Sequence, residues 1–198
     1  MRTSSLSLSL SASEIINGEW RLVSRAGDHH PRNYYAWNHM RNIVDLVVTR
    51  CGLPVCTTLL SLLPGHVLAW CIKHPSDVSG WSFLLFLYRR VGAPKESEWL
   101  LKNAIDAALS FQWSGEAFWS FVKASLASDG VCGKKARTMT LLRLRKAVPD
   151  GRATSLDMPA LKSAGHVNQA AQHKAAVRRA VSWIDKNWQP YDSGNDII

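Results

Sequence analysis

Apolar residues recur along most of the chain at intervals of three and four, which is the spacing of one face of an α-helix. A clear set is Leu101, Ile105, Ala108 and Leu109. On the other side of the same segment, Glu98 and Lys102 form an i,i+4 pair of opposite charge. The alternation that a strand needs is almost absent, apart from a serine-rich start that lacks β-branched residues. The pattern therefore predicts an all-α protein.

Three segments share a more specific pattern, in which a Trp is followed by apolar residues three and seven positions later. The segments are Trp37 with Met40 and Val44, Trp81 with Leu84 and Tyr88, and Trp119 with Val122 and Leu126. The three Trp are 44 and 38 positions apart, within the range of about 34 to 47 residues that helix-pair repeats span. Three such repeats are enough to stack a continuous core.

A short break with helix-starting residues precedes each of these Trp. The breaks contain Pro31 and Asn33, then Pro75, Ser76 and Asp77, then Ser114, Gly115 and Glu116. Small polar side chains there accept hydrogen bonds from the unpaired amides of the first helical turn. Another helical stretch comes before each break, at about 12–26, 55–73 and 95–112. The predicted unit is thus a helix, a tight turn and a Trp-bearing helix.

These patterns divide the chain into five segments. We expect a disordered N-terminus at 1–11, three helix-pair repeats at 12–128, a basic linker or irregular helix at 129–165, a C-terminal helix at 166–190 and a tail at 191–198. The apolar run at 57–72 is interrupted by Pro64 and Gly65 and is shorter than the ~20 residues of a membrane span. We therefore expect a buried helix there, bent or split at Pro64, and no membrane span.

Basic residues are concentrated in one stretch of this chain, whose formal net charge is +9. The stretch holds Lys134, Lys135, Arg137, Arg143, Arg145 and Lys146, with no carboxylate among them. Such a stretch suits nucleic acid, a nuclear import signal or an acidic partner. No aromatic residue is interleaved with it and no nucleic-acid-reading motif is present, so nucleic acid is not favoured. A solvated linker is the preferred interpretation.

The four cysteines, Cys51, Cys56, Cys71 and Cys132, form no CxxC pair and have no His at zinc-finger spacing. Reduced, mostly buried thiols are therefore expected, which suits a cytoplasmic protein. The serine-rich first residues are too polar for the apolar region of a signal peptide. His29, His30 and His39 lie near one another in sequence, but a metal site requires more ligands than this pattern supplies.

The segment at 30–39, His-Pro-Arg-Asn-Tyr-Tyr-Ala-Trp-Asn-His, resembles the repeat of protein prenyltransferase α subunits. That repeat has Pro, a basic residue, Asn-Tyr, two further residues, Trp, a polar residue and then His or Tyr. Weaker copies surround Trp81 and Trp119, and 74–81 also resembles the divergent branch called prenyltransferase α-subunit repeat-containing proteins. The repeat-motif positions are Pro31, Asn33, Trp37, His39, Asp77, Trp81, Glu116 and Trp119. The Arg that the family has three positions after each Trp is replaced by Met40, Leu84 and Val122.

The resemblance implies a right-handed superhelical stack of antiparallel helix pairs, an α-α solenoid. It also implies an α-type subunit of a heterodimeric protein prenyltransferase, which transfers a farnesyl or geranylgeranyl group to a protein cysteine. In that family the β subunit holds the catalytic zinc, so no cofactor is expected in this chain and no activity is expected from it alone. The partners implied are the β subunit, prenyl diphosphate at the subunit boundary and the protein substrate.

By the same resemblance, Arg32 and Tyr34 occupy the positions that approach the diphosphate leaving group. A cation and a hydroxyl there stabilise the negative charge that develops as the bond to diphosphate breaks, and Arg offers phosphate a planar charged fork. The alternatives are a solvated turn residue at Arg32 and a packing residue at Tyr34, while the three repeat Trp are expected to be structural. For the whole chain, the alternative is a non-catalytic helical-repeat scaffold for protein interactions, derived from the same fold.

Overall fold

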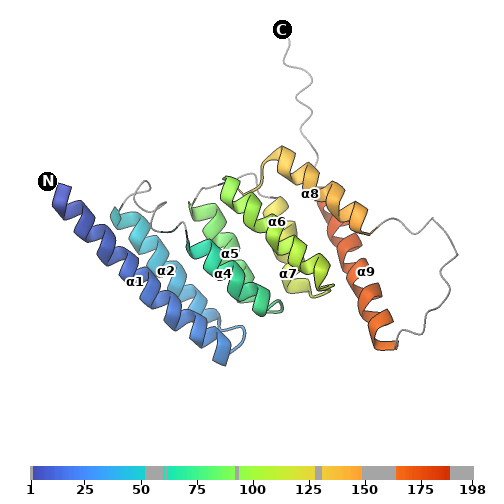
Figure 1. Cartoon of the computed structure of the whole chain (residues 1–198), viewed down its shortest axis with the longest axis horizontal. Helices are drawn as coiled ribbons and strands as arrows, with labels where there is room; N and C mark the ends of the chain where they lie inside the picture. The colour runs from blue at the N-terminus through green and yellow to red at the C-terminus, as the bar shows by residue number, and fades with distance from the viewer. Residues whose placement is uncertain are drawn as a thin grey trace, which may run out of the picture.

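The computed structural model describes residues 2–51, 60, 62–91, 94–127, 131–148 and 164–187. Within these ranges it contains eight α-helices and no strand, which confirms the predicted all-α class (Figure 1). The helices are α1 (Arg2–His29), α2 (Tyr34–Cys51), α4 (Leu63–Lys73), α5 (Val78–Val91), α6 (Pro94–Ser110), α7 (Glu116–Leu126), α8 (Lys134–Ala147) and α9 (Ala164–Asn187). None of the described helices is long and apolar enough to cross a membrane.

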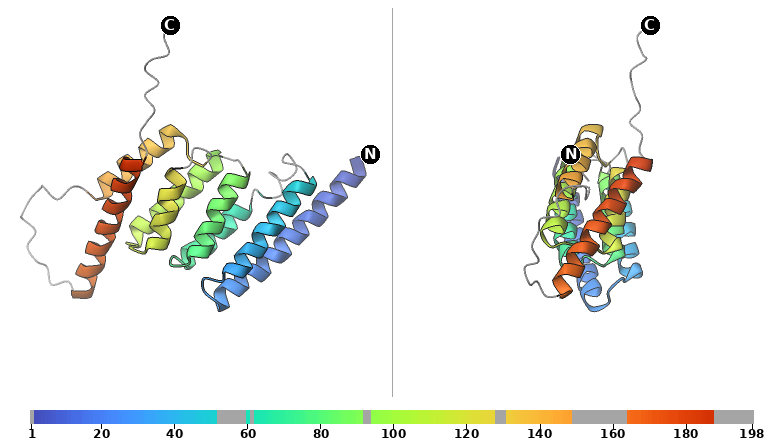
Figure 2. Two further views of the ribbon diagram at one scale, coloured as in Figure 1. Left: turned by 180° about the vertical axis from the view of Figure 1, so that it is seen from behind. Right: turned by 90° about the vertical axis from the view of Figure 1, so that its right-hand side faces the viewer.

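The helices form pairs that lie side by side in a row (Figure 1). Helix α1 packs on α2, α4 on α5, α6 on α7 and α8 on α9, and the first three pairs are antiparallel hairpins. Between pairs, α2, α5, α7 and α9 contact one another in turn and form one layer. The second layer consists of α1, α4, α6 and α8, as the two views in Figure 2 show. One continuous hydrophobic core lies between the layers.

The repeat Trp lies one turn inside the second helix of each hairpin. Its backbone N–H donates to the carbonyl four residues earlier, at Asn33, Asp77 and Gly115, over 3.3, 3.3 and 3.5 Å. The three Trp side chains are at most 1% exposed. Because the large ring follows the helix start by one turn, it fills the space between the helices of its own pair and those of the next.

Two of these Trp also fasten the turn that precedes their helix. The indole N–H of Trp81 donates to the Pro75 carbonyl, and that of Trp119 donates to the Trp113 carbonyl. Each bond is 3.0 Å long and reaches back six residues. Trp37 differs, since its indole nitrogen is buried without a hydrogen-bond partner among the described residues. The same ring therefore serves two purposes in α5 and α7: it packs, and it closes the turn.

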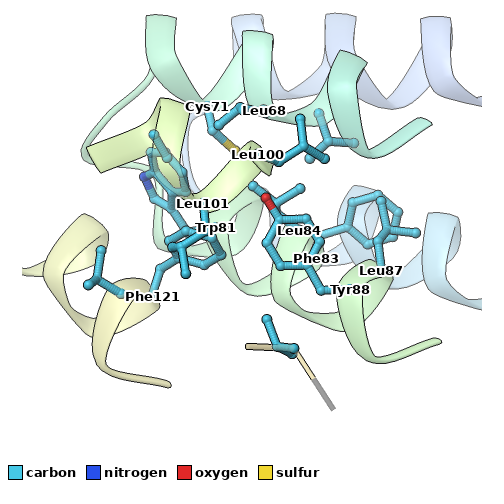
Figure 3. Close-up of a cluster of buried hydrophobic side chains, with 14 of the residues drawn as sticks. Leu68, Cys71, Trp81, Phe83, Leu84, Leu87, Tyr88, Leu100, Leu101 and Phe121 are labelled. Atoms are coloured by element: carbon cyan, nitrogen blue, oxygen red, sulfur yellow. The ribbon is translucent and has the colours of Figure 1, made fainter. Parts of the chain in front are cut away.

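Helix α5 lies in the middle of the core (Figure 3). Its residues Phe83, Leu84, Leu87 and Tyr88 are at most 1% exposed. They lie among side chains of the neighbouring helices, namely Leu68 and Cys71 of α4, Leu100 and Leu101 of α6, and Phe121 of α7 (Figure 3). Contact with α4 of its own hairpin and with α6 and α7 of the next hairpin explains why the sequence of α5 is apolar on most of its faces.

Trp70, near the end of α4, joins the first hairpin to the second. Its ring lies edge-on to Trp37 with centroids 4.9 Å apart, and its indole N–H donates to Oδ1 of Asp28 at 2.7 Å. The ring also lies against the backbone at Gly27 of α1 and Gly80 of α5. A Cβ at either glycine would come within 2.7 Å of the indole. Only glycine leaves room for this contact between the two hairpins.

Two segments differ from what the sequence predicted. Helix α1 begins at Arg2, within the segment 1–11 that we expected to be disordered, and serine carries only a modest helix penalty. Helix α8 is regular at Lys134–Ala147, where we expected a basic linker or an irregular helix. The apolar pattern of α8 is broken by Arg137, which is 0% exposed and donates from Nη2 to the Cys132 carbonyl at 3.1 Å. A fourth helix pair therefore follows the three that we expected.

The predicted break at Pro64 is the beginning of α4. That helix starts at Leu63 with Pro64 in its first turn, where the missing N–H of proline costs no helical hydrogen bond. Residues 57–59 and 61 of the apolar run lie outside the described residues, as do the expected tail at 191–198 and most of the expected linker beyond 148.

We predict that Gly80→Ala destabilises the protein by about 1–3 kcal/mol, because the Trp70 ring or α5 must shift to admit the methyl group. The matched control is Gly18→Ala in α1, where a new Cβ meets nothing within 4 Å and alanine gains about 0.5–1 kcal/mol as a helix former. Urea unfolding followed by circular dichroism measures both. A Gly80→Ala protein as stable as the Gly18→Ala protein would contradict the role given to Trp70.

Candidate functional site

The two residues for which a chemical role was expected lie at the turn between α1 and α2. Arg32 has a φ of 61°, in the left-handed region that non-glycine residues seldom adopt. Its backbone N–H donates to Oδ2 of Asp77 at 2.6 Å, and this bond from the second hairpin holds the turn. Tyr34, the first residue of α2, is 60% exposed and packs edge-on against Tyr35. The structure thus places Arg32 and Tyr34 at one exposed end of the first hairpin, next to Pro31, which is also exposed.

Asp77 connects two hairpins at this corner. Its Oδ1 accepts the N–H of Gly80 at 2.9 Å and caps α5, while its Oδ2 accepts the N–H of Arg32. The residue is only 4% exposed, so both bonds form away from water, where hydrogen bonds to a charged group are strong. Asn33 makes only the local version of this contact, since its Oδ1 accepts the N–H of Ala36 at 3.2 Å and caps α2.

Carboxylates fasten neighbouring helix pairs at other corners too. Besides the Trp70 indole, the Asp28 carboxylate contacts Nε2 of His74 at 3.4 Å. Oε1 of Glu98 in α6 accepts the N–H of Gly133, the residue before α8, at 2.9 Å. These contacts join residues 35 to 46 positions apart. The sequence does not reveal them, because no local pattern marks a bond between distant segments.

The other motif positions with polar side chains form surface hydrogen bonds. His39 lies 2.7 Å from Glu19 of α1, which ties the two helices of the first hairpin. Glu116 accepts a hydrogen bond from Lys123 at 2.7 Å, and this bond lowers the pKa of the Glu116 carboxyl. Among the described residues, no three His, Cys, Asp or Glu side chains lie close enough together to bind a metal ion.

Cys71 and Cys132 are buried and unpaired, which confirms the predicted state for these two thiols. The side chains of Cys51 and Cys56 lie outside the described part of the chain. Burial raises the pKa of the Cys71 thiol well above its usual range, and the nearby charge of Asp77 adds to this. Burial also raises the pKa of Cys132 to about 11. Both thiols are therefore protonated at neutral pH and serve as packing groups rather than nucleophiles.

A groove of about 640 Å³ lies between α6 and α8. Its lining consists of Lys95, Glu98, Trp99, Lys102, Ile105, Ala136, Met139, Thr140, Leu142, Arg143 and Lys146. Trp99, Met139 and Leu142 are 62%, 60% and 53% exposed, so three large apolar side chains face solvent here. Smaller hollows of about 440 and 320 Å³ lie between α8 and α9 and between α2 and α5. None of these three hollows is lined by Arg32 or Tyr34.

A known family matches the N-terminal part of the chain. The family model described as the ECM9 middle domain matches residues 8–103, which run from α1 into α6. The chain is similar to the ECM9 middle domain. The match covers just under half of the 198 residues and ends before α7, α8 and α9. No curated protein and no solved structure matches the chain.

The expected membership of the prenyltransferase α-subunit repeat family, and of its divergent branch, is wrong, because the family that matches is the ECM9 middle domain. The residues that carried the resemblance are those that a tight helix–helix turn requires on physical grounds. Asn33 caps α2, and Trp37 fills the core one turn later. The diphosphate role of Arg32 and Tyr34, and a zinc-bearing β partner, rested on that resemblance and stay predictions.

We predict that Asp77→Ala destabilises the protein by about 2–4 kcal/mol, because it removes a helix cap and a buried hydrogen bond to a charged acceptor. Asp77→Ser keeps one oxygen for Gly80 and loses the bond to Arg32, so its cost should be about 1.5–3 kcal/mol. Asn33→Ala removes a local cap alone and should cost about 1 kcal/mol. Urea unfolding ranks the three. Asp77→Ser at wild-type stability would contradict the bond between hairpins.

In a Cys51→Ser, Cys56→Ser background, we predict that iodoacetamide modifies Cys71 and Cys132 of the folded protein at pH 8 at least about tenfold more slowly than in urea. Folding also raises the pKa values of these thiols, so it favours their protonated form. Their contribution to the free energy of unfolding is therefore complete below pH 9 and is lost as the pH rises toward about 11. Mass spectrometry of the labelled protein gives the rates. Fast labelling of both thiols in the folded protein would contradict their burial.

Proposed function

We propose that this chain is a non-catalytic scaffold for protein interactions, in which the helix pairs form one right-handed superhelical stack. The observation that carries the proposal is that successive helix pairs share the same turn and the same first turn of the second helix. In each of α2, α5 and α7, a buried Trp follows the helix start by one turn. Stacked helix pairs of this kind contact their neighbours and leave extended surfaces to which partners bind.

The polar groups buried between helix pairs support a structural role. Asp77 joins the first hairpin to the second. His173 of α9 is 6% exposed, and its Nδ1–H donates at 2.7 Å to the carbonyl of Trp113, in the turn before α7. Such contacts hold successive pairs at defined positions, and a preorganised surface binds a partner with a smaller loss of entropy.

Exposed apolar side chains support the binding of a partner. Those on α6 and α8 gather around the groove between these helices, and gathered apolar side chains on a surface mark interaction sites. We also propose a cytoplasmic location, because the thiols of Cys71 and Cys132 are unpaired. Nothing in this proposal requires the chain to perform chemistry of its own.

The scaffold predicts a stable complex in the cell. We would capture the tagged full-length chain from its native cells, identify its companions by native mass spectrometry and rebuild the complex from purified components. We expect one protein partner in a fixed ratio to the chain. The control is Trp119→Asp, which puts a charge into the core of the hairpin that carries α6 and should release the partner. A chain recovered free of any companion would contradict the scaffold, as would a partner equally retained by Trp119→Asp.

A further inference from the structure

We propose that the groove between α6 and α8 binds an acidic amphipathic helix of a partner protein. The proposal rests on the scaffold function and names the class of partner. Trp99 of α6 and Met139 and Leu142 of α8 supply the apolar part of the groove, and each is more than half exposed. Side chains this accessible form a shallow surface, which suits the apolar face of a helix better than an enclosed small molecule.

The lining residues follow the spacing of one helical face on each side of the groove. On α6 they include positions 95, 98, 99 and 102, and on α8 they include positions 136, 139, 140 and 143. Both sets have offsets of zero, three, four and seven, so each forms a single stripe along its helix. Seven residues of a helix span about 10 Å, so the two stripes match two turns of a third helix laid between them.

The charge of the groove selects an acidic partner. Four cations line it, Lys95 and Lys102 from α6 and Arg143 and Lys146 from α8, against the single carboxylate of Glu98. The lining therefore carries an excess of positive charge. Complementary charge across an interface orients the partner and raises its association rate.

The carboxylates near the groove are already engaged. Oε1 of Glu98 accepts the N–H of Gly133, and Asp106 is shared by Lys102 and Arg143. Lys95 and Lys146 form no ion pair within the part of the chain that the structure describes. Carboxylates on either side of a partner's apolar stripe would pair with these two ammonium groups.

A helix fits this groove better than a nucleic acid does. Single-stranded nucleic acids bind basic grooves in which successive bases stack on several aromatic side chains. Here Trp99 is the one aromatic residue of the lining, and the rest of the exposed apolar surface is aliphatic or thioether. Met and Leu side chains instead match the apolar face of an amphipathic helix.

The test uses the full chain and two fluorescein-labelled 18-residue helical peptides with the same leucine stripe. One peptide carries glutamates beside the stripe and the other carries lysines. Fluorescence anisotropy should show the acidic peptide binding at least tenfold more tightly than the basic one. The affinity should also weaken as salt is added, because exposed charges are screened.

Two pairs of variants locate the site. Lys95→Glu with Lys146→Glu should weaken the acidic peptide at least tenfold, whereas Lys73→Glu with Lys174→Glu, the same charge change at exposed positions elsewhere, should leave it within twofold. Trp99→Ala should weaken binding in the same way. The matched control for Trp99→Ala is Phe111→Ala, which removes an equally exposed aromatic ring outside the groove.

Several outcomes would overturn the proposal: equal binding of the two peptides, equal loss in both charge-reversed proteins, or displacement of the acidic peptide by single-stranded RNA or by anionic vesicles at lower concentration. A chain ending at Asn187 that binds the peptide tenfold more tightly would assign the groove to this chain's own acidic segment 188–198 instead.

If the captured partner stays bound to the Lys95→Glu, Lys146→Glu protein, the scaffold stands and this site is wrong. If no partner is captured but the peptide binds as described, the groove stands and the scaffold is wrong.

Discussion

The stack depends on the contact of Trp70 with two glycines and a carboxylate. Its indole enters the space between the first two hairpins because Gly27 and Gly80 present no side chain there, and Asp28 satisfies its N–H at the edge of the core. A ring of this size contributes dispersion to every neighbour that it touches. It also fixes how closely α1 and α5 approach α4, and hence how the second hairpin is oriented on the first.

Polar groups at the corners add direction to this apolar packing. Hydrophobic burial alone does not define the rotation of one helix pair on the next, but a hydrogen bond between a buried carboxylate and a backbone N–H does. Asp77 makes such a bond to Arg32, and the half-buried Glu98 makes a more exposed bond of the same kind to Gly133. The second of these bonds also positions α8 beside α6. The groove between α6 and α8 therefore depends on the bond between Glu98 and the turn before α8.

The local features of the chain could be predicted from the sequence, whereas the contacts between pairs could not. The interval between Trp37, Trp81 and Trp119 gave the hairpins, because a buried ring one turn after a cap is a property of a few adjacent residues. The regularity of α8 was not expected, because Arg137 occupies a core position and interrupts the apolar pattern. Trp70 and Asp28 acquire their roles only when segments about 40 residues apart meet.

The candidate site likewise combines local features, which the sequence shows, with contacts between distant segments, which it does not. The turn at 30–33 looked like a chemical motif because Pro, a basic residue, Asn and Tyr stand together, yet in the structure this turn receives a bond from Asp77 and leaves Arg32 and Tyr34 exposed. For the groove, the sequence showed only the basic stretch from Lys134 to Lys146. Its apolar part combines residues of α6 and α8, which no sequence window contains.

The most direct test of this account is hydrogen exchange, followed helix by helix, in the wild-type chain and in Asp77→Ser. If the hydrogen bonds between hairpins make the hairpins open together as one cooperative unit, the loss of the single bond between Asp77 and Arg32 should speed exchange in α1 and α2 as well as in α4 and α5. Faster exchange confined to the first turn of α5 would contradict the account, because it would mean that each hairpin holds its position without the corner.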